Sequence, residues 1–306
     1  MEGIVFKSTG SWYKVRLDNG QLIDCRLKGK FKMTKTGSTN PIAVGDRVEV
    51  ELEGQEGNGL IVSISDRNNY LIRKSVHKTG QSHILAANLD QLVIIASLKL
   101  PRTSLGFIDR LLVSAEAFHI PARVVFNKTD LLEDDELEYA RDLSKMYSSI
   151  GYDSFLTSVA DELNLDLFYA CLKGQTSLLC GHSGVGKSSL VNLVSPNLKL
   201  KTQEISSFAN KGKHTTTYAE MFELEPGTFI IDTPGIKELG LVEMDDENLS
   251  GYFPEMRPFL RHCKFYNCTH QHEPGCAVEA AVQKGLLPLP RYESYLSLMA
   301  NEDNRR

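Results

Sequence analysis

The sequence predicts a multidomain α/β protein in three parts, at residues 1–72, 73–240 and 241–306. Short segments that alternate polar and apolar residues fill the first part, and apolar strands alternate with helical segments in the second. The third part contains a cluster of cysteine and histidine residues. We therefore expect an OB-fold β-barrel, a mainly parallel sheet with helices on both faces, and a mostly helical zinc-binding domain.

The N-terminal part has the pattern of a small antiparallel barrel. Segments 13–17 and 47–52 alternate polar and apolar side chains, and the turns 18–20 and 57–59 separate such segments. About 70 residues in roughly five strands favour an OB-fold, a scaffold that commonly binds oligonucleotides, over the alternative of an SH3-like barrel. The polar stretch 74–88 is expected to be a linker.

Composition limits the function classes that the chain fits. Of its 306 residues 42% are hydrophobic and 24% charged, and the formal net charge is -5. No apolar run approaches the roughly 18 residues of a membrane span, and residues 1–7 lack the layout of a signal peptide. We therefore expect a cytoplasmic location. The net charge gives no global argument for nucleic-acid binding.

One segment of the N-terminal part is locally basic. It contains five cations with no acid between them, namely Arg26, Lys28, Lys30, Lys32 and Lys35. Such a loop is suited to contacts with nucleic-acid phosphates, and a solvated hairpin without a ligand explains it equally well.

The central part alternates strands and helices. Its expected strands are 92–96, 122–126, 154–156, 177–180 and 228–231, and its clearest helices are 136–149 and 187–194. Strands and helices in this order build a mainly parallel sheet, which binds ligands at the carboxyl ends of its strands. The motifs of this chain follow those strand ends.

The strongest motif is a phosphate-binding loop. Residues 181–188 match G-x-x-x-x-G-K-[ST] after an apolar strand and before a helix. Backbone N–H groups of such a loop face the phosphates, Lys187 neutralises β- and γ-phosphate oxygens, and the Ser188 hydroxyl binds Mg²⁺. The expected binding residues are Gly181, His182, Ser183, Gly184, Val185, Gly186, Lys187, Ser188 and Ser189.

A second motif indicates a guanine reader. Asn127, Lys128, Thr129 and Asp130 match N-K-x-D directly after a predicted strand. The carboxylate of Asp130 accepts two N–H donors from guanine. Adenine lacks this donor pair, so it would leave the polar groups of the site unpaired and bind more weakly. Ser158, Val159 and Ala160 follow the next strand, where they either contact the guanine carbonyl oxygen or form a plain loop.

Residues 232–235 match D-x-x-G, in which Asp232 holds Mg²⁺ through water and the Gly235 N–H contacts the γ-phosphate. A simple Pro-Gly turn is the alternative. Upstream, residues 212–217 lie where a mobile switch is expected, and Thr216 or Thr217 completes the Mg²⁺ shell.

The order of these motifs is unusual, because the guanine reader precedes the phosphate loop, whereas Ras-like GTPases have the reverse order. Loops at one edge of one sheet keep their geometry when old ends are joined and new ends are cut at the surface. The chain is therefore predicted to be a circularly permuted GTPase. The segment after Gly235 continues directly into the last part of the chain. A movement of this segment that depends on the γ-phosphate would therefore be transmitted to the last part.

The last part contains metal ligands in the pattern C-x4-C-x-H-x5-C, formed by Cys263, Cys268, His270 and Cys276. Three thiolates and one imidazole make a closed tetrahedral Zn²⁺ site, which is structural because it leaves no vacancy for water. His262 and His272 stay open as alternative nitrogen ligands. Helices are expected at 277–284 and 292–300 in this part. The cysteines elsewhere in the chain, Cys25, Cys171 and Cys180, are expected to be inert core residues.

Together, the barrel, the motifs GxSGVGKSS, HTTT and DTPG, and the cysteine pattern resemble the bacterial small-ribosomal-subunit-dependent GTPase A family over nearly the whole chain. The resemblance implies a ribosome-assembly factor that binds the 30S subunit late in maturation, and a factor docked on the ribosome is most simply a monomer. It implies contacts with 16S rRNA through the barrel and the zinc domain, and GTP hydrolysis that the subunit stimulates. GTP with Mg²⁺ and one structural Zn²⁺ are the implied cofactors.

The sequence also predicts slow intrinsic hydrolysis. Ile236 follows the D-x-x-G motif, at the position where Ras-like proteins place a glutamine that orients water. His214 is the candidate for the missing group, and a solvent-exposed loop histidine is the equal alternative. Two other classes stay open: a binding module whose nucleotide site is a structural prop, and a P-loop ATPase or kinase, against which Asp130 argues.

Overall fold

The computed structural model describes residues 1–28, 41–53, 57–74, 82–194, 219–232 and 246–300. The chain forms two compact units. Unit 1 comprises Met1–Val93, Leu165–Cys180 and Lys187–Val242, and unit 2 comprises Ile94–Asn164, Gly181–Gly186 and Glu243–Arg306. Among the described residues, no helix has the length and apolar character to cross a membrane.

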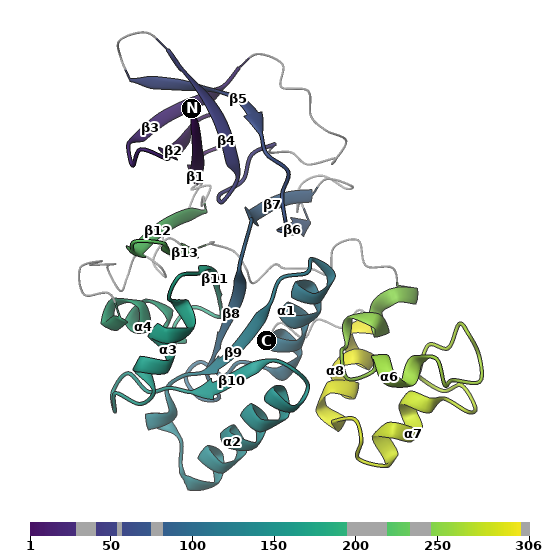
Figure 1. The fold of residues 1–306 in the computed structure, drawn as a ribbon. Coiled ribbons are helices and arrows are strands. Elements are labelled where there is room, and N and C mark those ends of the chain that lie inside the picture. Colours follow the sequence, from purple (N-terminus) through teal and green to yellow (C-terminus); the bar gives the residue numbers. More distant parts are fainter. Residues whose placement is uncertain (29–40, 54–56, 75–81, 195–218, 233–245, 301–306) are drawn as a thin grey trace, which may run out of the picture. The chain divides into compact units, whose positions relative to one another are not determined.

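Five strands at the start of unit 1 form the predicted barrel (Figure 1). They are β1 (Glu2–Ser8), β2 (Tyr13–Leu17), β3 (Leu22–Leu27), β4 (Arg47–Glu53) and β5 (Asn58–Ile64). The strands pair in the order β1-β2-β3-β5-β4, and β1 also pairs with β4, which closes the ring. Alternate side chains such as Val15, Cys25 and Ile61 fill the interior. This five-stranded ring confirms the expected OB-like barrel.

The linker predicted for 74–88 is wrong, because much of it is a strand. Strand β7 (Ser82–Ala87) pairs antiparallel with β6 (Tyr70–Lys74) as a two-stranded sheet. Ile84, Leu85 and Ala86 are buried. Burial of these apolar side chains favours a packed strand over a solvated linker, although the stretch begins with polar residues.

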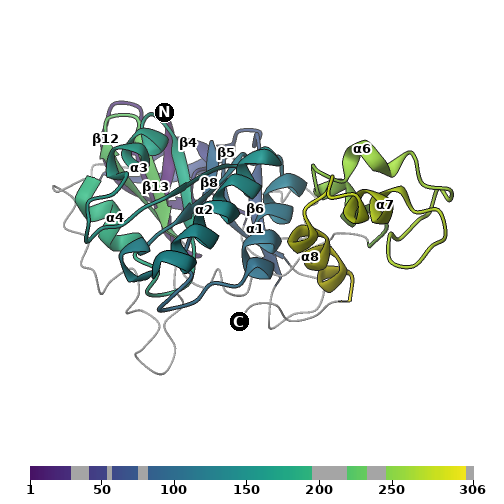
Figure 2. The same ribbon diagram turned by 90° about the horizontal axis from the view of Figure 1, so that it is seen from below.

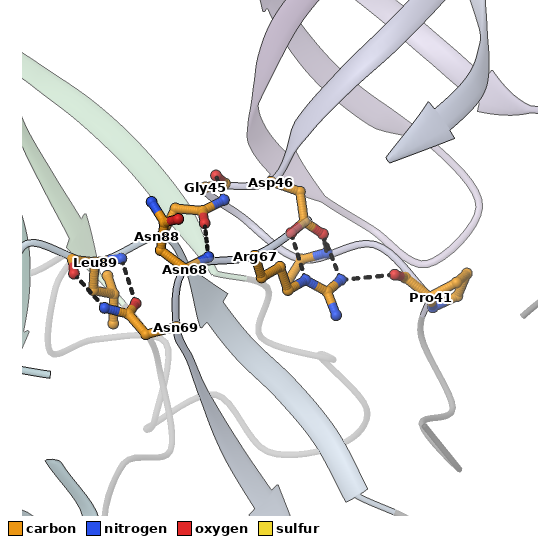
Figure 3. Close-up of polar contacts among 9 residues, drawn as sticks. Pro41, Gly45, Asp46, Arg67, Asn68, Asn69, Asn88 and Leu89 are labelled. Atoms are coloured by element: carbon orange, nitrogen blue, oxygen red, sulfur yellow. Dashed lines mark hydrogen bonds and ion pairs between the residues drawn. The ribbon is translucent and has the colours of Figure 1, made fainter. Parts of the chain in front are cut away.

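A buried ion pair holds the chain after β5 to the barrel (Figure 3). The Arg67 guanidinium donates to both carboxylate oxygens of Asp46, at 2.6 and 2.7 Å, and to the Pro41 carbonyl at 2.9 Å. Asp46 is fully buried and also accepts the Ala43 backbone N–H. Bidentate Arg–carboxylate pairs fix orientation as well as distance, so this contact sets the exit direction of the chain.

Two asparagines extend this junction into the central part (Figure 3). The Asn69 side chain and the Leu89 backbone form reciprocal hydrogen bonds of 2.8 Å. The Asn88 amide donates to the Gly45 carbonyl. A Cβ at Gly45 would lie 2.1 Å from the Ala87 carbonyl oxygen, so this approach requires glycine.

The rest of unit 1 continues the sheet. Strands β11 (Thr176–Cys180) and β13 (Thr228–Asp232) are parallel, and β12 (Glu220–Glu225) pairs antiparallel with β13 and then with β1. Helices α3 (Leu165–Leu172) and α4 (Lys187–Val194) also belong to this unit. The fully buried β8 (Gln91–Ala96) neighbours β11 and runs on into unit 2.

In unit 2, β8 neighbours β9 (Ala122–Phe126), which pairs in parallel with β10 (Asp153–Leu156). Helix α2 (Asp134–Ser149) packs on these strands and begins with a capping box formed by Glu133 and Glu136. Helix α1 (Leu105–Ala117) begins at Ser104, whose side chain accepts the Phe107 N–H. A short 3₁₀ helix, η1 (Thr129–Leu131), follows β9.

The C-terminal part is helical, as predicted, and belongs to unit 2. It contains η3 (Asp246–Tyr252), α6 (Arg257–Leu260), α7 (Ala277–Gln283) and α8 (Leu289–Met299). Figures 1 and 2 show α8 beside α1. Arg291 of α8 is fully buried and pairs with Asp109 of α1 at 2.5 Å and with Glu255 at 2.6 Å. The Tyr147 hydroxyl donates to the same Asp109 carboxylate.

Candidate functional site

The predicted guanine-reading loop begins where β9 ends. The Asn127 backbone N–H donates to the Ala96 carbonyl at 2.8 Å, which continues the strand pairing by one residue. Lys128 then has a φ of 65°, a left-handed conformation that turns the chain into η1. Its ammonium group donates to the Leu100 carbonyl at 2.7 Å, so the side chain helps to hold this turn.

The Asn127 side chain joins three loops that are distant in sequence. Its amide NH₂ donates to the Val185 carbonyl of the phosphate loop at 2.8 Å, and its amide oxygen accepts the Thr157 hydroxyl at 3.0 Å. The contact is close, because a Cβ at Gly186 would lie 2.3 Å from the Asn127 amide nitrogen. Gly186 also has a φ of 99°, so two independent constraints favour glycine there.

A hydroxyl orients the carboxylate of the exposed Asp130. The Ser158 Oγ donates to Asp130 Oδ1 at 2.8 Å and accepts the Asp161 backbone N–H at 3.0 Å. Val159 is half-buried and Ala160 is exposed beside this contact. The two predicted base-contacting loops therefore lie side by side.

The phosphate loop connects β11 to α4. A Cβ at Gly181 would lie 2.2 Å from the Ile95 carbonyl oxygen, so the loop starts in close contact with β8. The His182 ring is buried and stacks on Phe107 of α1, with 4.1 Å between ring centroids and 26° between planes. Phe107 is a residue that the sequence analysis missed, because a lone aromatic in an apolar helix carries no motif.

Helix α4 begins at Lys187, the predicted phosphate-binding cation. Ser188 is buried, and Lys187 and Ser189 are half-buried in the first turn. The backbone N–H groups of a helix start attract anions, so the location suits phosphate oxygens.

Asp232 ends β13, beside Leu179 of β11. Burial raises the pKa of Asp232 to about 6, Lys187 opposes that rise, and Glu220 adds to it. Lys187 therefore acts electrostatically on the carboxylate that is predicted to serve Mg²⁺. His214, Thr216, Thr217, Gly235 and Ile236 lie outside the described residues.

The C-terminal cysteine and histidine residues converge as a possible metal site. The ligand atoms of Cys263, Cys268, His270 and Cys276 all lie within 4.8 Å of one another. His270 Nδ1 is 3.5 Å from the Sγ atoms of both Cys263 and Cys276. A tetrahedron with Zn–S of about 2.3 Å and Zn–N of about 2.0–2.1 Å has an S···N edge of about 3.6 Å. The donor set therefore fits a tetrahedral ion.

Hydrogen bonds around the group hold its ligands in place. The carboxylate of Glu273 accepts the Thr269 N–H at 2.8 Å, the Thr269 hydroxyl at 2.5 Å and the Gln271 N–H at 3.1 Å. The Tyr292 hydroxyl of α8 donates to the His270 carbonyl at 2.6 Å. His262 and His272 are exposed and do not belong to the group.

Of the remaining cysteines, two lie in the core as expected and the third does not. Cys25 and Cys180 are buried and Cys171 is half-buried. Burial raises the pKa of the Cys25 thiol to about 11, which keeps it protonated at neutral pH.

Comparison with known proteins decides the family. Residues 64–242 match the RsgA GTPase domain, and residues 2–61 match the RsgA N-terminal domain. The chain belongs to the RsgA GTPase family. It is therefore a circularly permuted GTPase, an enzyme that hydrolyses GTP, as the motif order predicts.

Individual relatives match over nearly their full length. The chain is 49% identical over 303 residues to "Small ribosomal subunit biogenesis GTPase RsgA 2" of Bacteroides thetaiotaomicron, covering 99% of this chain and 97% of the relative. The crystal structure of YjeQ from Thermotoga maritima superposes with a TM-score of 0.79 at 34% identity, covering 98% and 97% of the two chains. YloQ, described as a circularly permuted GTPase, gives a TM-score of 0.74 at 31% identity, covering 100% and 96%.

The raised pKa of Asp232 predicts a pH-dependent stability cost. Because the folded-state pKa of about 6 exceeds the ordinary 3.8, folding favours proton uptake between these values. The nucleotide-free protein should therefore lose stability as the pH rises through this window. We expect Asp232→Asn to raise the Tm by several degrees at pH 7.5 and by roughly half as much at pH 5, measured without nucleotide or Mg²⁺.

The exposed Asp142 of α2 provides a matched control, since Asp142→Asn removes a carboxylate that is not buried. Its effect on Tm should be small and nearly the same at both pH values. An Asp232→Asn effect that does not change with pH would contradict the burial cost.

Proposed function

We propose that this GTPase acts in the cytoplasm, as a monomer, in late maturation of the 30S small ribosomal subunit. The observation that carries the nucleotide part is the hydrogen bond from Asn127 to Val185, because it joins the base loop to the phosphate loop. The ribosomal part rests on family membership and on the name of the Bacteroides relative.

In this proposal the loops of unit 2 bind the nucleotide base. Asp130, oriented by Ser158, accepts the guanine N–H donors, while Asn127 keeps the loops together. Lys128 and Thr129 complete the base loop, and Val159 and Ala160 offer backbone N–H groups to the guanine carbonyl. An acceptor that is oriented in this way discriminates between bases, because a base without the matching donors leaves it unpaired in the complex.

The proposed phosphate site uses residues 181–189. Lys187 neutralises the β- and γ-phosphates, Ser188 and Thr216 bind Mg²⁺, and Asp232 supports the ion through water. Thr217, Gly235 and His214 are proposed to act at the γ-phosphate. Mg²⁺ supplies charge stabilisation when bound, and the 30S subunit supplies or orders the group that positions water.

The Cys₃His group is proposed to hold one structural Zn²⁺. Four protein ligands leave no position for a reacting water, and the S···N separations fit the ion. The barrel in 1–72 and the zinc-binding part in 241–306 are proposed to contact 16S rRNA, and the part in 73–240 is proposed to be the GTPase domain.

Stimulated turnover tests the enzyme proposal directly. We expect phosphate release from GTP to rise when 30S subunits are added, and Lys187→Ala to reduce it on the order of 100-fold, because phosphate charge loses its partner. If the wild type released phosphate at the same rate with and without 30S subunits, the proposal would be contradicted. If Lys187→Ala supported normal 30S maturation in cells, the protein would act as a binding module instead.

Base selectivity tests the role of Asp130. Asp130→Asn replaces an acceptor by an amide, so GTP affinity should fall about 100-fold or more while affinity for xanthosine triphosphate rises. Calorimetry with both nucleotides measures the exchange, and Asp142→Asn should leave both affinities unchanged. Equal affinity of the wild type for ATP and GTP would favour a P-loop ATPase or kinase of another class.

Metal analysis tests the zinc proposal. We expect one zinc per purified chain, and Cys276→Ser should lose it and lower the Tm, since structural zinc sites contribute folding free energy. Cys171→Ser is the matched control because Cys171 lies outside the group, and this variant should retain the metal. A wild type that keeps its Tm and helix content after chelation would contradict a structural role.

A further inference from the structure

The loop between Cys263 and Cys268 presents an unusual aromatic side chain. Tyr266 is 103% exposed, the largest value among the large apolar side chains that the structure describes, and the adjacent Phe265 is 40% exposed. Figures 1 and 2 both show the chain between α6 and α7 as an open loop on the side away from α1. The Tyr266 ring is therefore offered to solvent rather than to the core.

The loop is anchored at both ends. Cys263 and Cys268 belong to the proposed metal site, and the Lys264 N–H donates to the Gly275 carbonyl at 3.2 Å. The Lys264 ammonium also lies 5.4 Å from the centroid of the Phe265 ring. A ligand that binds a held loop loses little conformational entropy, so an exposed aromatic at this position is preorganised for contact.

The charge around the loop favours an anionic partner. No aspartate or glutamate occurs between Glu255 and Glu273, a segment that contains Arg257, Arg261 and Lys264. Among the described residues, Arg257 pairs with Glu116, whereas Arg261 and Lys264 form no ion pair. Two cations without a described ion pair thus lie within five residues of Tyr266 in the sequence.

The barrel differs in this respect. Each of its described basic residues already pairs with an acid, namely Lys7, Lys14, Arg16, Arg26, Lys28 and Arg47. Such pairs must separate before phosphates can replace the acids. Segment 261–266 therefore combines an exposed aromatic ring with two cations that form no ion pair in the described part of the chain, as surfaces that stack unpaired bases do.

We propose that loop 264–267 is an RNA-contact surface on which Tyr266 stacks against an unpaired base, while Arg261 and Lys264 contact the neighbouring phosphates. This proposal rests on the proposed 30S function and assigns its contact mode to particular residues. An aromatic ring accepts any base face, so the contact reads an unstacked nucleotide rather than a sequence.

Affinity for purified 30S subunits, measured with a non-hydrolysable GTP analogue, tests the stacking. Tyr266→Ala should weaken binding roughly 5- to 150-fold, whereas Tyr266→Phe should stay within about twofold because it keeps the ring. Tyr139→Ala removes a 50% exposed tyrosine of α2 and should have no effect. Arg261→Gln should reduce the slope of log affinity against log salt by about 0.7–0.9.

Several outcomes would overturn the proposal. Unchanged binding by Tyr266→Ala excludes a contact, and equal losses for the Phe and Ala variants indicate a hydroxyl hydrogen bond instead of stacking. Cross-linking from Tyr266→p-azidophenylalanine should recover rRNA, and a cross-link to a ribosomal protein would replace RNA by a protein partner. Retained zinc and Tm establish that each variant is folded.

The same experiment separates this inference from the proposed function. A wild type that does not bind 30S subunits would remove both proposals together. A wild type that binds and is stimulated, alongside a Tyr266→Ala variant of equal affinity, would remove the stacking proposal alone.

Discussion

The buried hydrogen bond between the Asn127 amide and the Val185 carbonyl is the constraint on which the proposed nucleotide site depends. It joins residues that are 58 positions apart in the sequence. The Asn127 amide lies so close to the loop that there is no space for a Cβ at Gly186. The order of the two loops along the chain does not affect this contact, since both emerge at strand ends. A permuted chain thus keeps the local geometry of the unpermuted one.

Much of the fold was predictable from local sequence patterns. The five barrel strands and the bounds of α4 were predictable because alternation and a glycine-rich loop before a helix carry local signals. The strand β7 was misassigned because its pairing with β6 is a tertiary contact. Strand β12 was not predicted, and its place beside β1 depends on tertiary contacts, since Glu220 and Glu223 pair with Lys7 and Arg16 of the barrel.

Site residues were predictable where a motif carries the chemistry, as for Asn127 or Cys263. Residues that support the site through packing were not predictable. Phe107 stacks on His182 of the phosphate loop, and Asp109, two residues later on the same helix, pairs with Arg291 of α8. One helix thus contacts both the phosphate loop and the C-terminal part, an arrangement that no local pattern reports.

The burial of Arg291 has a consequence for dissecting the molecule. A fragment that stops near residue 240 would lack α8, and with it both the guanidinium partner of Asp109 and the cover over one face of α1. The apolar side chains of α1 that this cover buries would then face water, which costs about 25 cal/mol per Å² of exposed apolar surface. Truncation near residue 240 would therefore disrupt unit 2, and the central and C-terminal parts are better studied in the intact chain.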